Sequence, residues 1–96
     1  MTELQEKCMY LYSLVNDCLV DLTDEGFTID TKFEYKSDED IFLIITIRDI
    51  LPSDIKKIME SIDDMTSHLT GEGVRLISNE FSNRLSLKNM ELMFRL

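Results

Sequence analysis

Cationic residues are scarce in this chain of 96 residues. Ten lysines and arginines face nineteen aspartates and glutamates, which leaves a net charge of −9 and an isoelectric point near 4.4. A surface of that sign repels nucleic acids and anionic membranes and attracts basic surfaces. Direct binding to nucleic acid or to a membrane is therefore not expected. Two explanations of the acidity stay open: it keeps a small domain soluble, or it serves recognition.

Metal-binding and catalytic motifs are scarce as well. There is one histidine, His68, and both cysteines are expected on the buried face of a different helix, so no zinc ligand set is predicted. The acidic run at 38–40 lacks the spacing of an EF-hand loop, and the glycines at 71 and 73 form neither a dinucleotide fingerprint nor a P-loop. No cofactor or metal is therefore expected, and we predict that the protein is not an enzyme.

The sequence also has no long apolar run, and its two cysteines are not expected to form a disulfide. Cys8 and Cys18 are predicted to lie on one helix, where ten residues separate their Cα atoms by roughly 15 Å, whereas a disulfide requires about 7 Å or less. Free thiols suit a reducing compartment. No apolar stretch approaches the roughly 18 residues of a membrane-spanning helix, and no basic segment precedes an apolar run at the N-terminus. The expected location is the cytoplasm.

Two amphipathic helices are predicted within a single domain, residues 1–96. Residues 3–24 carry apolar side chains every three or four positions, and Gly26 follows closely enough to end this helix. Pro52 and Ser53 open the second helix, with Ser53 as its N-cap. Each helix thus has one apolar face that can cover a sheet.

Four strands are predicted from changes in the hydrophobic pattern. Residues 27–36 alternate apolar and polar, which is typical of a half-buried edge strand. Residues 41–48 are apolar on both faces, which is typical of a central strand. A third strand begins at 74–77 and then fades. Residues 84–96 form the fourth, with an irregularity near 88–89.

The two halves of the chain follow one plan. Shifting the sequence by 47 residues places Glu25 and Gly26 on Glu72 and Gly73, and six identities at this offset support two αββ units, 1–48 and 49–96. The predicted fold class is α+β: αββαββ, a four-stranded, mostly antiparallel sheet with two helices on one face. If each unit's second strand is central, this is a circular permutation of the ferredoxin-like plan. A simple antiparallel meander is the alternative.

The face of the sheet that the helices leave open is predicted to carry an apolar patch. Phe42, Ile44, Ile77 and Met93 are its expected members, and the first, second and fourth of these form the candidate dimer interface. An exposed apolar patch usually marks an interface. A homodimer through this face is the first expectation, and a different protein partner is the second.

One side of the first helix concentrates negative charge. At about 100° per residue, its carboxylates fall within about 60° of one another, and a hairpin turn adds three more. The candidate partner-binding residues are Glu3, Glu6, Asp17, Asp21, Asp24, Asp38, Glu39 and Asp40. A row of this kind could occupy the basic cleft of a DNA-binding protein through charge pairs that salt would screen.

In size, acidity and lack of catalytic motifs, the chain resembles the small acidic DNA-mimic inhibitors of bacteriophages, some of which block host restriction enzymes or nucleoid proteins. The resemblance concerns overall character. It implies a non-enzymatic inhibitor of a basic DNA-binding protein in the host cytoplasm, dimeric so that the acidic row doubles in length. Two other functions stay open. One is an adaptor that binds through its open sheet face, and the other is a small-molecule sensor or enzyme with its site in a sheet cleft.

Overall fold

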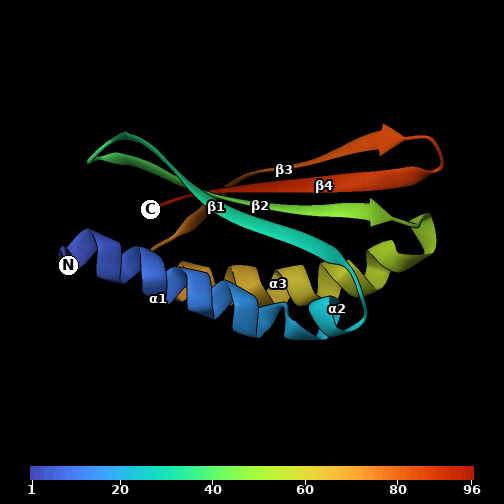
Figure 1. Ribbon diagram of the computed structural model, residues 1–96, viewed down its shortest axis with the longest axis horizontal. Coiled ribbons are helices and arrows are strands. Elements are labelled where there is room, and N and C mark those ends of the chain that lie inside the picture. Colours follow the sequence, from blue (N-terminus) through green and yellow to red (C-terminus); the bar gives the residue numbers. More distant parts are fainter.

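The computed structural model has an α+β fold in which the helices cover one face of a four-stranded sheet (Figure 1). The helices are α1 (Glu3–Cys18), α2 (Val20–Asp24) and α3 (Ile55–Gly71), and a 3-10 turn, η1 (Pro52–Asp54), precedes α3. The strands are β1 (Thr28–Ser37), β2 (Asp40–Ile50), β3 (Arg75–Arg84) and β4 (Leu87–Arg95). None of the helices combines the length and the apolar character needed to cross a membrane.

The strand order confirms that each unit's second strand lies in the centre of the sheet. The order is β1-β2-β4-β3, and every neighbouring pair is antiparallel. β2 and β3 therefore run parallel, with β4 between them and α3 crossing over from one to the other. This is the circular permutation of the ferredoxin-like plan, and the pairing of β2 with β4 excludes the meander.

The hydrophobic core lies between the inner face of the sheet and the helices. Alternate residues of β2 face inward, which explains why one face of this strand is fully buried. Three inner pairs join β2 to β4, and all six side chains are buried: Leu43 with Phe94, Ile45 with Leu92, and Ile47 with Met90. No polar or charged residue is buried, so the core is held by apolar packing alone.

The sequence repeat is also a structural repeat. β1 and β3 are both ten residues long, and they begin and end 47 positions apart. The chain leaves both helices through the same turn: Phe27 donates its backbone N–H to the carbonyl of Leu22 at 3.1 Å, and Val74 donates to Leu69 at 2.9 Å. Such six-to-one bonds are typical of a Schellman helix end. The 47-residue offset therefore extends to individual hydrogen bonds.

The first helix differs from the prediction because it is interrupted. Residues 3–24 were expected to form one helix, but Leu19 has φ −104° and ψ 10° and separates α1 from α2. The Thr23 hydroxyl donates to the Leu19 carbonyl at 3.3 Å. Thr70 makes the same back-bond to Thr66 at 2.8 Å within the uninterrupted α3, so this contact alone does not account for the break.

The second hairpin also differs from the prediction. β3 does not fade but continues to Arg84, and the turn falls at residues 85–86. A register shift just after Leu76 inserts one extra residue, so the inward positions continue at Asn79 and Phe81. Because side chains alternate with a period of two, one inserted residue reverses the pattern. This is why the strand was not recognisable beyond residue 77.

The irregularity predicted near residues 88–89 is present, but its extra residue lies on β2. The pairing shifts between Ile47 and Ile50, opposite Asn89. There the backbone N–H of Asp49, which has a φ of 58°, donates to Asn89 Oδ1 at 3.0 Å. The side chain of Asn89 thus satisfies a backbone group that the bulge removes from the ladder.

The start of the second helix needs a further correction. Pro52–Asp54 form the 3-10 turn, and α3 begins only at Ile55. No side chain caps α3, so Ser53 is not its N-cap. Instead, the carboxylate of Asp54 accepts the backbone N–H of Leu51 at 3.3 Å.

Replacing either turn glycine with alanine should lower the free energy of unfolding by about 1 kcal/mol, because an L side chain is strained at positive φ. Gly26 and Gly73 have φ of 96° and 78°, and no atom lies within 4 Å of a Cβ added at either position. Gly71, in the last turn of α3, has the same open space without a positive φ and is the matched control. Gly71→Ala should raise stability slightly. Urea denaturation measures all three, and equal changes at the three positions would contradict the account.

Candidate functional site

Negative charge is concentrated in the helix layer. Residues 1–26 and 52–73, which contain the helices, hold eleven carboxylates and three lysines, a net charge of −8. Residues 27–51 and 74–96, which contain the strands, hold eight carboxylates and seven lysines or arginines, a net charge of −1. Nearly the whole net charge of −9 therefore lies on one side of the molecule.

Ion pairs reinforce this separation. The sheet has three of them, each between exposed or half-exposed side chains: Lys32 with Glu34, Arg48 with Asp30, and Arg95 with Asp40. In the helix layer, Lys57 pairs with Glu25, and His68 lies beside Asp64. Most carboxylates of the helix layer therefore have no cationic partner within the chain.

The five helical carboxylates predicted as a binding surface are all exposed to solvent: Glu3, Glu6, Asp17, Asp21 and Asp24. Two of them, Asp21 and Asp24, line a groove of about 410 Å³ between α2 and α3. Glu25 and Glu60 line the same groove, with Lys57 as its one cation. The structure thus adds Glu60 to the predicted set, whereas the charge of Glu25 is compensated by Lys57.

The hairpin turn contributes less to the acidic row than predicted. Figure 1 shows the β1–β2 turn at the same end of the molecule as the start of α1, where Glu3 and Glu6 lie. Asp38 and Glu39 are exposed there. Asp40, however, accepts a hydrogen bond from Arg95 Nη2 at 2.7 Å. Its charge is compensated by the sheet, so it is not a free member of the row.

The apolar patch expected on the open sheet face is exposed only in part: Ile77 is 50% exposed, but Ile44 is not. Ile44 is only 4% exposed, although it points away from the core, because its neighbours on the sheet cover it. The ammonium of Lys36 lies 5.4 Å from the centre of the Phe42 ring. Phe42 and Met93 remain half-buried. The homodimer through this face stays a prediction, and it would depend on these two side chains.

Exposed apolar surface is found instead beside α1. Two adjoining hollows, of about 410 and 310 Å³, lie between this helix and β1. Their apolar lining includes Cys8, Met9, Tyr12, Phe33 and Tyr35. Cys8 was expected on the buried face of its helix, but hydrophobic periodicity does not show where the sheet extends beyond the helix that covers it.

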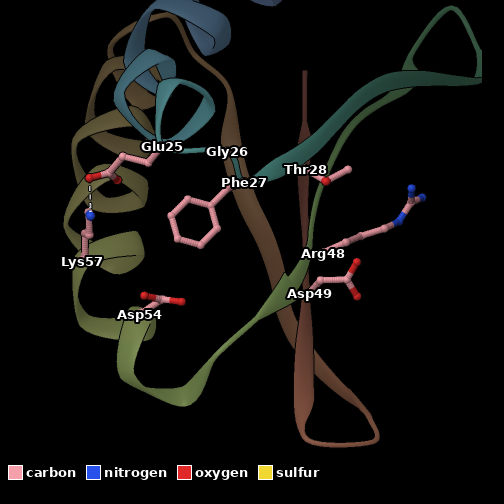
Figure 2. A pocket seen from close by; sticks show the side chains of 8 residues that line it. All are labelled: Glu25, Gly26, Phe27, Thr28, Arg48, Asp49, Asp54 and Lys57. Atoms are coloured by element: carbon pink, nitrogen blue, oxygen red, sulfur yellow. Dashed lines mark ion pairs between the residues drawn. The ribbon is translucent and has the colours of Figure 1, made fainter.

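A polar cleft of about 510 Å³ opens between the α2–β1 turn, the end of β2, η1 and the start of α3 (Figure 2). Figure 2 shows Glu25 and Lys57 joined on the helix side, the Phe27 ring pointing into the gap, and Arg48 on the opposite side. Both cations already have carboxylate partners, because Arg48 pairs with Asp30. The cleft therefore lacks a free cation that would bind an anionic ligand.

Tyr10 connects the two helices at the other end of the layer. Its hydroxyl donates to Glu72 Oε1 at 3.0 Å. The hydrogen bond to Glu72 and the negative charge of this carboxylate raise the pKa of Tyr10 above its ordinary value of 10.0. At the 47-residue offset this contact corresponds to the ion pair of Lys57 with Glu25. The equivalent glutamates, Glu25 and Glu72, thus each bond to a side chain on the helix of the other unit.

The chain matches no known family model, no curated protein and no solved structure. The distribution of charge is therefore the observation that bears on function. The helix layer is acidic and exposed, the sheet is nearly neutral, and the cations of the polar cleft are already paired.

Replacing Glu72 with glutamine should lower the pKa of Tyr10 toward its ordinary value, because the charge that favours the protonated phenol is removed. In the native protein the raised pKa means that the contact stabilises the fold below the ordinary tyrosine pKa. That contribution is lost as the pH rises through the folded-state value. An ultraviolet titration of tyrosinate checks this, with Tyr10→Phe identifying the signal of Tyr10. An unchanged titration in Glu72→Gln would contradict the assignment.

Proposed function

We propose that this protein binds a basic, DNA-binding protein through the outer face of its helix layer, and that it inhibits or regulates this partner without catalysing a reaction. The observation that carries the proposal is the separation of charge, −8 in the helix layer against −1 in the sheet. Charge that serves solubility alone is spread over the surface with both signs mixed. The sheet has that mixed character, and the helix layer does not.

The dimensions of the helix layer fit such a role. From Glu3 to Asp24 the first two helices extend over roughly 32 Å, at about 1.5 Å per residue. Duplex DNA of that length carries roughly 19 phosphates, at one charge per about 1.7 Å. The layer's eleven carboxylates amount to more than half of that number. A cleft shaped and charged for duplex DNA would therefore meet a comparable, though weaker, negative surface.

The groove between α2 and α3 is the centre of the proposed contact. Four carboxylates, from Asp21, Asp24, Glu25 and Glu60, line it beside a single lysine. Arginine side chains bind carboxylates through two parallel hydrogen bonds, which adds geometric specificity to charge attraction. An arginine or lysine of the partner that reaches into this groove would meet several acceptors at once.

Neutralising three carboxylates of the helix layer should weaken binding strongly. The variant Glu6→Gln, Asp17→Asn, Asp21→Asn removes three charges from the proposed contact and leaves the core intact, because all three are exposed. Immobilised protein would be incubated with a lysate of its native host at low and at high salt. We expect the wild type to retain basic DNA-binding proteins at low salt, to release them at high salt, and the variant to retain at least tenfold less.

The matched control removes the same charge from the sheet. Asp49→Asn, Glu80→Gln, Glu91→Gln alters three exposed residues of β2, β3 and β4 and produces the same net charge. It should retain the partner as well as the wild type does. Equal losses in the two triple variants would show that only net charge matters. The proposal would be overturned if the amount of partner retained changed neither with salt nor with the helix-layer substitutions.

A further inference from the structure

Three side chains of types that can coordinate metals lie close together between the two αββ units. Cys18 is the last residue of α1, while Asp64 and His68 lie on α3. Their ligand atoms all lie within 4.8 Å of one another. The sequence prediction of no zinc ligand set placed both cysteines on the buried face of a different helix. Cys18 packs against the core as expected but is only half-buried, and its thiol also lies beside His68.

The local geometry leaves the ligand atoms available. Asp64 and His68 are four residues apart, which puts them on one face of α3. His68 Nδ1 lies 2.8 Å from the Asp64 backbone carbonyl, which accepts its proton in the tautomer that leaves Nε2 as the ligand atom. The Asp64 carboxylate is 3.6 Å from the same Nδ1, too far for a good hydrogen bond. A backbone carbonyl that fixes the histidine tautomer is a common feature of metal sites.

The electrostatic surroundings favour a cation. α1 ends at Cys18, and no basic residue of this helix lies in its last turn. The carboxylate of Asp64 adds negative charge beside the Cys18 thiol.

We propose that Cys18, Asp64 and His68 form a zinc site that bridges the two αββ units, with water at a fourth position. Thiolate, imidazole and carboxylate together suit Zn²⁺, whereas Ca²⁺ and Mg²⁺ prefer oxygen ligands alone. Tetrahedral zinc with bonds of about 2.0–2.3 Å holds its ligand atoms roughly 3.3–3.8 Å apart, so rotations of the exposed Asp64 and His68 side chains complete the site. The site is independent of the proposed function.

Cobalt binding tests the site directly. The reduced, chelator-treated protein would be titrated with Co²⁺ and then with Zn²⁺. We expect a thiolate-to-cobalt charge-transfer band, tetrahedral d–d absorption, and loss of both when one equivalent of Zn²⁺ is added. Cys18→Ser should abolish the charge-transfer band and weaken zinc binding more than about 100-fold, because it removes a direct ligand. Cys8→Ser, on the same helix, is the matched control and should leave the spectrum unchanged.

The two ligands on α3 give a second, independent readout. Asp64→Asn and His68→Gln alter exposed side chains, so the variants should keep the wild-type circular dichroism spectrum. Zinc should raise the midpoint of thermal unfolding of the wild type and of the control Asp63→Asn, and much less that of either ligand variant. A cobalt spectrum without the thiolate band would overturn the proposal. Equal losses in Cys8→Ser and Cys18→Ser, or wild-type zinc stabilisation in both α3 variants, would overturn it as well.

Discussion

The pairing of β2 with β4 is the constraint on which the rest of the molecule depends. These strands come from different halves of the chain, and their inner side chains are fully buried, from Leu43 opposite Phe94 to Ile47 opposite Met90. Because this pair occupies the centre, β1 and β3 become edges and both helical segments lie on the same face. The core beneath them is wholly apolar, so charged residues must face outward.

That arrangement sorts the charges of the molecule. Side chains that point away from the sheet meet cations on neighbouring strands, as Asp30 meets Arg48 and Asp40 meets Arg95. The helices carry few cations, so their outward carboxylates remain largely unpaired. Packing α3 beside α1 and α2 then places Glu60 with Asp21, and His68 with Cys18. The acidic layer and the candidate zinc site thus have one structural origin.

Much of the fold could be predicted from the sequence, because the spacing of apolar residues and the internal repeat can both be read directly from it. The two-sided apolar pattern of 41–48 indicated a central strand, and the 47-residue offset indicated two equivalent units. Predictions went wrong where one residue changes the phase, as at the bulge after Leu76, or interrupts a helix, as Leu19 does between α1 and α2. The exposed acidic residues were predictable from helical geometry. The neighbours across the helix pair were not, since Tyr10 and Glu72 are 62 residues apart.

The central claim is that the acidic helix layer occupies a surface that its partner uses for DNA. Competition for a partner captured from the host measures this most directly, with duplex DNA added to the preformed complex at constant ionic strength. The account predicts mutual exclusion: DNA releases this protein, and this protein lowers the partner's affinity for DNA by the same factor. A stable ternary complex, with the affinity for DNA unchanged, would contradict it.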